Sequence, residues 1–279
     1  MDHREPDRSR SGGRPDARLQ AGRHAAAKGG AQRPVRAKNG SILLFHIGDS
    51  GGAVGGSAFA HHAEAPEGPW YPLKGPRCNN PAPMVAANGT TYVGCNNGGF
   101  TIFRSDDVFS GDDWVEVTKM AFPPSWGTGA LAPYLKNEDP YLWMDTRGNF
   151  HLLAHRYDYR DGYPANPNQT EPLLVSGHGF SVDGLDWHFN VEQQPYDAVV
   201  KFANGTVQQF STFERPHLVF DKTSGRPTHL VTAAQPYWMG PRGPCDGCSA
   251  RPGSEHSCVV CKTTPGIDYT YTLVSKLNA

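Results

Sequence analysis

The chain has 279 residues, with 26 Lys and Arg against 27 Asp and Glu, and it contains 32 Gly and 24 Pro. No apolar run approaches the ~18–20 residues of a membrane-spanning helix, so we expect no membrane span. The many glycines and prolines, with an aromatic content of 11%, do not suit a helical bundle. The composition favours an all-β fold of short strands joined by tight turns.

The N-terminal segment differs in charge from the rest of the chain. Residues 1–40 hold 10 Lys and Arg and 4 Asp and Glu, a net charge of +6, whereas residues 41–279 hold 16 and 23, a net charge of −7. The segment has no aromatic residue and too little apolar surface to offset the entropy of ordering, so we predict that residues 1–38 are disordered. Without interleaved aromatic residues, its basic charge does not indicate a nucleic-acid partner. It also lacks the apolar core of a signal peptide.

From residue 39 a turn followed by an alternating strand recurs along the chain. The turns are Asn39-Gly40, Asn88-Gly89, Arg147-Gly148 and Asn204-Gly205, and their glycines lie 49, 59 and 57 positions apart. Asn-Gly predicts a type I′ hairpin, because both central residues of that turn need positive φ. The spacing is typical of one β-propeller blade.

Two further features recur with the turns. A polar residue precedes proline in Asn79-Asn80-Pro81, Glu138-Asp139-Pro140 and Glu214-Arg215-Pro216, and each proline lies 8 or 9 positions before a turn glycine. Each module also has a tryptophan in a polar turn, at Trp70, Trp114 and Trp187. The pattern predicts four-stranded modules, and therefore a β-propeller domain over residues 39–279.

A propeller would bring the strand starts that precede proline together around one central channel. The carboxylates of Glu138, Asp139 and Glu214 would then meet at the mouth of one pocket. The alternative is that each acidic residue is a solvated strand end. Recurrence at the same module position favours the pocket.

The six cysteines fall into two groups. Cys78 and Cys95 flank one predicted hairpin, and four more form paired C-x-x-C motifs in a Cys-rich loop at 245–261: Cys245, Cys248, Cys258 and Cys261. Four thiolates at this spacing could hold a structural zinc ion. An oxidising compartment would instead make them disulfides.

Three N-glycosylation sequons bear on that choice, at Asn88, Asn168 and Asn204. Together with the Cys78 and Cys95 pair they favour disulfides and an extracellular or secretory location, although no signal peptide is present in this sequence. We expect no cofactor, with structural zinc as the alternative. Both interpretations of the cysteine cluster stay open.

The modules resemble the five-bladed β-propeller glycosidases of the furanosidase type, the arabinanase and xylosidase group called glycoside hydrolase family 43. The segment Ser181–Trp187 is similar to the Ser-x-Asp-Gly-x-x-Trp turn of their blades and to the sialidase Asp-box. In that family an Asp base, an Asp that tunes the acid, and a Glu acid follow in chain order on inner strands. The resemblance implies a five-bladed propeller in which Asp139 takes the second role and Glu214 the third.

The first acid is where the sequence departs from the family. The strand before Asn39-Gly40 should carry it near positions 30–32, which read Gly30-Ala31-Gln32, and the next inner strand offers the amide of Asn80. An amide cannot accept a proton as a carboxylate does. Either the chain is a non-catalytic propeller, or the basic stretch 1–36 replaces a true first blade and leaves that blade incomplete.

A complete site would hydrolyse a glycosidic bond by acid–base catalysis. Glu214 would protonate the leaving oxygen, its pKa raised by a neighbouring carboxylate such as Asp139 or Glu138, while a second carboxylate activates water. Arg215 would pair most naturally with a carboxylate such as Glu138. We predict catalytic roles for Glu214, Asp139 and Glu138.

The candidate substrate-binding residues are Asn80, His178, Arg215, Trp143 and His229. Trp143, Tyr141 and Trp238 could stack on sugar faces or belong to the core. His178 lies between two glycines that would let a ligand approach, with a structural role as the alternative. His229, His151 and His155 alternate with apolar residues and could point into the channel.

The leading hypothesis is therefore a monomeric glycosidase-like propeller acting on an oligo- or polysaccharide. The alternative is a non-catalytic propeller that binds glycans or proteins. A third hypothesis, a zinc-stabilised nuclear protein with a basic arm, would require zinc at the cysteine cluster.

Overall fold

A computed structural model describes residues 32–47, 58–96, 99–120, 122–123, 126, 135–158, 175–210, 212–235 and 271–277. Its regular elements are antiparallel strands, which confirms the all-β prediction. No helix among these residues has the length and apolar character needed to cross a membrane.

The strands form four blades and one separate hairpin. Blade 1 contains β1 (Gln32–Arg36), β2 (Ile42–Ile47), β3 (Ala58–Ala63) and β4 (Tyr71–Leu73). Blade 2 contains β5 (Ala82–Val85), β6 (Thr91–Asn96), β7 (Phe100–Ser105) and β8 (Val115–Lys119). Blade 3 contains β9 (Leu135–Met144), β10 (Phe150–Asp158), β11 (Ser176–Ser181) and β12 (His188–Phe189). The hairpin pairs β13 (Val199–Lys201) with β14 (Val207–Gln209), and blade 4 contains β15 (Thr212–Phe220), β16 (Pro227–Gln235) and β17 (Tyr271–Lys276).

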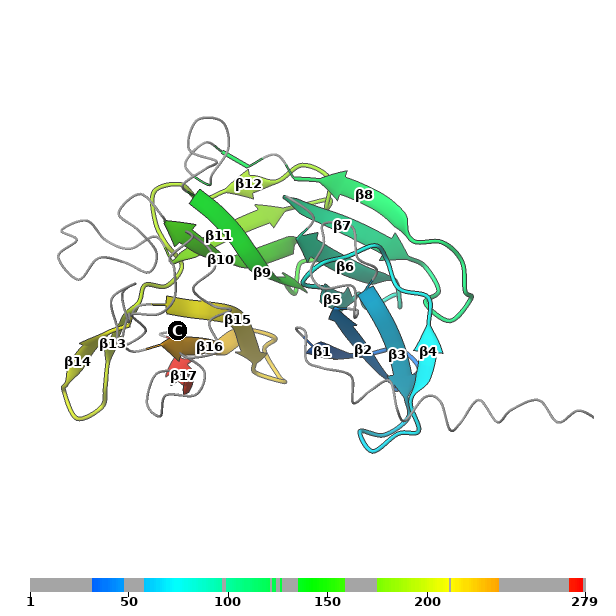
Figure 1. Ribbon diagram of the computed structural model, residues 1–279, viewed down its shortest axis with the longest axis horizontal. Helices are drawn as coiled ribbons and strands as arrows, with labels where there is room; N and C mark the ends of the chain where they lie inside the picture. The colour runs from blue at the N-terminus through cyan, green and yellow to red at the C-terminus, as the bar shows by residue number, and fades with distance from the viewer. Residues whose placement is uncertain are drawn as a thin grey trace, which may run out of the picture.

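The blades are arranged around a common centre as in a β-propeller (Figure 1). The first strand of each blade, β1, β5, β9 or β15, lies innermost, and β9 contacts both β5 and β15. The described residues contain four blades, three of four strands and one of three, so the predicted count of five is not seen among them. The propeller architecture itself is confirmed.

Apolar layers between neighbouring blades form the core. Leu43 and Phe45 of blade 1 pack with Val93 of blade 2, and all three are fully buried. Ile102 of blade 2 and Leu152 of blade 3 belong to a second layer between those blades. Blade 2 thus packs against an apolar layer on each of its two faces, which explains the alternating or continuous apolar runs in its strands.

Blade 1 corrects the predicted N-terminal boundary. Part of the segment 1–38 that we predicted to be disordered is ordered, because residues 32–36 form β1. In its register with β2, Pro34 lies opposite Leu44 and Arg36 lies opposite Ile42. Blade 1 therefore has four strands, so the first blade of the described chain is complete. The basic, Pro-containing strand has weak strand propensity, but the backbone ladder to β2 outweighs it.

The turn type also differs from the prediction. Gly40, Gly89 and Gly148 have positive φ of 90°, 101° and 88°, but the residue directly before each of these glycines does not have a positive φ. In the first turn Ala37 N donates to Ser41 O at 2.8 Å and Gly40 N donates to Ala37 O at 2.9 Å. This is a type I turn closed by a left-handed glycine, not type I′, so the turn needs only the glycine to be left-handed.

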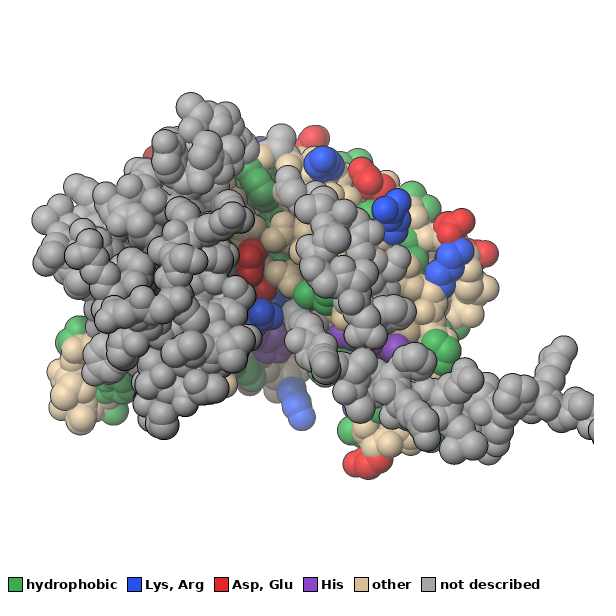
Figure 2. All heavy atoms as spheres, in the orientation of Figure 1, with side chains coloured by type: hydrophobic (Ala, Val, Ile, Leu, Met, Phe, Trp, Pro, Cys, Tyr) green, Lys and Arg blue, Asp and Glu red, His purple; other side chains and the backbone are tan. Residues whose placement is uncertain are grey.

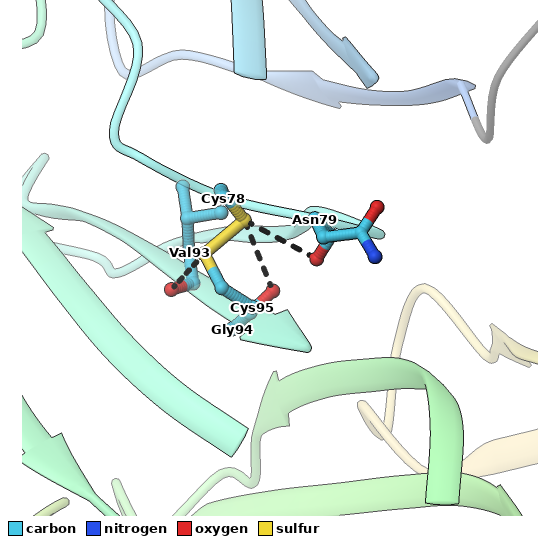
Figure 3. The surroundings of a disulfide bond; sticks show 5 residues. All are labelled: Cys78, Asn79, Val93, Gly94 and Cys95. Carbon is cyan, nitrogen blue, oxygen red and sulfur yellow. Dashed lines mark hydrogen bonds between the residues drawn. A yellow bond between two sulfur atoms is a disulfide. The ribbon is translucent and has the colours of Figure 1, made fainter. Parts of the chain in front are cut away.

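Blade 2 contains a disulfide that joins Cys78 to Cys95, with an S–S distance of 2.05 Å (Figure 3). It confirms a disulfide at the predicted pair. The sequons at Asn88 and Asn204 lie in exposed turns. The sequon at Asn168 and the cysteine cluster at 245–261 lie outside the described residues.

Candidate functional site

Three residues with a strained backbone mark the starts of inner strands. Asn80, Asp139 and Arg215 have φ of 45°, 49° and 53°, and they are the non-glycine residues with positive φ in the described chain. Each directly precedes a proline, a position that favours extended backbone. A left-handed non-glycine residue costs roughly 1–2 kcal/mol, so its repetition at equivalent positions in three blades indicates a constraint from function or packing.

These three residues meet at the centre of the propeller. Asp139 is completely buried, and its Oδ1 accepts a hydrogen bond of 3.2 Å from Asn80 Nδ2. The same oxygen lies 3.6 Å from Arg215 Nη1. The ion pair of Arg215 is thus with Asp139, whereas we had expected Glu138 as the partner. The predicted residues Asn80, Asp139 and Arg215 are brought together.

The environment of Asp139 combines burial with two cations. Burial raises the pKa of Asp139, while the charges of Arg215 and Arg33 oppose that rise. The second carboxylate oxygen of Asp139 has no hydrogen-bond partner within the described chain. A buried acceptor without a partner is costly, so this oxygen lowers the stability of the folded chain.

Glu214 and His155 complete a cluster with Asp139. One ligand atom of each, a carboxylate oxygen or a ring nitrogen, lies within 4.8 Å of the others. Burial lowers the pKa of His155 to about 3, with a further contribution from the charge of Arg215, so the imidazole stays neutral. Neutral imidazole and carboxylates are the ligand types that hold a cation. Two carboxyl groups this close also disfavour joint ionisation.

The four inner strands line a cavity of about 500 Å³, and Arg215 connects it to the cluster, because Arg215 lines the cavity and pairs with Asp139. Asp139, His155 and Glu214 are not among the lining residues. The polar and aromatic lining residues are Arg33, Arg36, Tyr141, Trp143, Arg215 and His217. Figure 2 shows acidic, basic and histidine side chains together near the middle of the same view. Trp143 and Arg215 are the predicted substrate-binding residues that line this cavity.

The other predicted site residues are not among the lining residues, but His178 stacks on Trp143, which is, with ring centroids 5.9 Å apart. His178 on β11 stacks on His151, whose Nδ1 is 3.1 Å from His178 Nε2. Burial lowers the pKa of His178 to about 4, followed by the effect of His151. His229 lies on the second strand of blade 4, with Nδ1 3.0 Å from Thr228 Oγ1. Glu138 lies on β9 opposite His155 in the strand register.

The sequence analysis missed several residues of the centre. Arg33 was assigned to the disordered segment, yet its Nη1 donates to Pro216 O at 3.5 Å and its guanidinium lies 5.9 Å from the centre of the Tyr141 ring. The Arg33-Pro34 step was a usable signal, because the other inner strands also start with a polar residue before proline. His217 directly follows Glu214-Arg215-Pro216, so its place at the centre could have been predicted from the same motif.

The fold was compared with known proteins. No protein-family model matches the sequence, and no curated protein matches it. Among solved structures, an endo-arabinase from Bacteroides thetaiotaomicron matches with 11% identity over 89% of this chain and 75% of its own, at a TM-score of 0.50.

Two further solved structures match at lower TM-scores. A thermostable family-43 glycoside hydrolase has 14% identity over 74% of this chain, at a TM-score of 0.49. An endo-1,4-beta-xylanase from Bacteroides thetaiotaomicron has 15% identity over 76% of this chain, at a TM-score of 0.46. This chain covers 66% of each, just under two thirds of their length. The match to the endo-arabinase, at a TM-score of 0.50 and 11% identity, supports the β-propeller fold and no more than the fold.

Proposed function

We propose that the chain acts on an oligo- or polysaccharide at the central cavity, as a glycoside hydrolase with Glu214 as the acid. The observation that carries the proposal is the meeting of Glu214 with the strained, buried Asp139 beside the cavity. A buried carboxyl group with a raised pKa and a strained backbone, as Asp139 has, is typical of catalytic centres.

The geometry supports distinct roles for the two carboxyl groups. Glu214 is partly exposed and could deliver a proton to a bound sugar, whereas Asp139 is fully buried. Inverting glycosidases separate acid and base by about 6.5–9.5 Å. The approach of the Asp139 and Glu214 oxygens within 4.8 Å is closer than that, so Asp139 fits the role of tuning Glu214 and not that of the base. The position expected for the base, residues 30–32, begins before the described chain.

The covalent chemistry of blade 2 supports a secretory or extracellular location. The Cys78–Cys95 disulfide is stable in an oxidising compartment, and the exposed turns at Asn88 and Asn204 are accessible for glycosylation. A monomeric state remains a prediction.

The test is an assay of the full chain for product release from a panel of neutral and acidic oligosaccharides. We expect Glu214→Gln to lower turnover by about 10²–10⁴-fold while glycan binding persists, because the amide cannot donate the proton. The matched control is Glu116→Gln on β8, whose side chain is exposed far along the blade. It should behave as the wild type, and equal turnover of Glu214→Gln and the wild type would refute the assignment of Glu214.

A non-catalytic, glycan-binding propeller is the second candidate. It is favoured by the two guanidinium groups of Arg33 and Arg215 around Asp139, since both charges favour the ionised carboxylate. In that case the wild-type chain would bind a glycan saturably and release no product, and Glu214→Gln would bind as the wild type does.

A further inference from the structure

The charged side chains among the described residues that line the central cavity are all basic, while the carboxylate of Asp139, which is not part of the lining, pairs with Arg215. Three arginines, Arg33, Arg36 and Arg215, line the cavity together with His217, and none of the described lining residues carries a carboxylate. The remaining described lining is apolar or aromatic. A concave, partly apolar surface with guanidinium groups attracts anions, because the low-dielectric walls strengthen the field of the cations.

The arginines have donors to spare. Within the described chain, Arg36 Nη1 donates to Gly40 O at 2.6 Å, Arg33 Nη1 donates to Pro216 O at 3.5 Å, and Arg215 Nη1 lies 3.6 Å from Asp139 Oδ1. Each contact uses one nitrogen of a group that has five N–H donors. The fork geometry of guanidinium matches the paired oxygens of a carboxylate or a sulfate.

The arginine charges also repel one another. Burial lowers the pKa of Arg33, and the charge of Arg215 lowers it further, while Asp139 counteracts both. Asp139 is thus the nearby anion shared by two guanidinium groups. A bound anion in the cavity would offset this repulsion, so the charged forms of Arg33 and Arg215 would favour anion binding.

The rest of the cavity suits a sugar. Its volume of about 500 Å³ lies within the range of ligand sites. Tyr141 and Trp143 are half-buried and stacked, with ring centroids 5.8 Å apart, and Trp143 also stacks on His151 at 4.9 Å, so a sugar would pack on the part of the ring that His151 leaves uncovered. Aromatic faces of this kind pack against the C–H faces of sugar rings.

We propose that the central cavity selects sugars that carry an oxyanion, a carboxylate or a sulfate ester, with Arg33, Arg36 and Arg215 binding the anion and Trp143 packing on the ring. This inference rests on the proposed carbohydrate function and narrows its substrate class to acidic glycans.

The test compares ligands that differ only in charge, by calorimetric titration of the full chain. One pair is a galacturonic acid trimer and its methyl ester, and the other is a sulfated galactan oligosaccharide and its desulfated form. We expect the charged member to bind at least about tenfold more tightly. The difference should shrink in 0.5 M NaCl, because salt screens the cations. The pair that shows the larger difference identifies the oxyanion.

Variants then assign the effect to the cavity. Arg36→Gln and Arg215→Gln should each weaken binding of the charged ligand about tenfold and leave binding of the uncharged ligand unchanged. Arg104→Gln is the matched control, since Arg104 is an exposed residue of β7 paired with Asp106. Thermal unfolding checks that the variants fold, and Arg36 is the first choice because Arg33 also contacts Pro216 and Tyr141.

Each contrary result has a distinct meaning. Equal affinity for the charged and uncharged members of both pairs overturns the inference and leaves the proposed carbohydrate function standing. Turnover or binding of neutral glycans alone does the same. Failure to bind any of the four glycans overturns the inference, and the separate assay of the oligosaccharide panel decides the proposed function.

Discussion

The hairpin turns and the inner strand ends both use the left-handed backbone, but they reach it with different residues. In the turns, glycines such as Gly148, with φ of 88°, adopt it at little cost. At the centre, Asn80, Asp139 and Arg215 adopt it although each carries a side chain and precedes a proline. The turns therefore need only chain reversal, whereas the centre accepts strain in order to aim particular side chains at one point.

The largest expected effect comes from removing the buried carboxylate at the centre. Asp139→Leu should lower the free energy of unfolding by about 3 kcal/mol, because Arg215 and Arg33 lose their shared anion and Asn80 loses its acceptor. Urea denaturation at pH 7 measures it. The value lies at the low end for buried pairs because Arg215 is 46% exposed and can turn toward water.

An exposed ion pair provides the control for that measurement. Lys74 and Asp113 approach to 2.6 Å, but the Asp113 side chain is 90% exposed. Asp113→Leu should change the free energy of unfolding by less than about 1 kcal/mol. Equal losses in the two variants would mean that burial at the centre does not strengthen the pair.

The next effect concerns buried histidines and acid. The pKa of His178 is lowered to about 4 by burial and by His151, and that of His155 to about 3 by burial and by Arg215. Unfolding would restore both pKa values to about 6.5. Their contribution is therefore complete above pH 6.5 and is lost as the pH falls, because the unfolded chain then binds protons that the folded chain does not.

His178→Gln isolates one of these contributions. Between pH 7 and pH 5 the wild type should lose about 2 kcal/mol of unfolding free energy through His178, and the variant should lose that much less. Denaturation at both pH values gives the difference. An unchanged pH dependence in His178→Gln would show that His178 titrates normally in the folded chain.

How far the sequence predicts this molecule depends on whether the signal is periodic. The turn glycines and the polar residues directly before proline recur at blade spacing. They therefore predicted the positions of the strands and the meeting of Asp139, Glu214 and Arg215 at one centre. β1 was missed because composition was averaged over residues 1–40, which hid a five-residue strand whose stability comes from pairing with β2.

Local patterns left out the packing partners in two other places. The glycines beside His178 suggested room for a ligand, and Gly177 makes room for Trp126, whose ring lies where a Cβ would be; the site role of His178 stays a prediction. Asn-Gly was read as a type I′ turn, yet the Asn39 side chain accepts the amide of Ser41 at 3.0 Å and stabilises a type I turn. Both outcomes depend on partners that a local pattern does not contain.

The smallest expected change in stability comes from replacing a glycine, and its sign should depend on whether the glycine has a positive φ. Gly148→Ala should destabilise the chain by about 1 kcal/mol, since space is open around its Cβ position but φ is 88°. Gly94→Ala on β6 is the matched variant, because Gly94 lacks a positive φ and its Cβ would meet ordinary contacts at 3.7 Å from Ala82. Restricting the unfolded chain should make that variant neutral or slightly more stable. Opposite signs in thermal unfolding would assign the cost at Gly148 to backbone conformation, whereas equal losses would assign it to packing in the strands on either side.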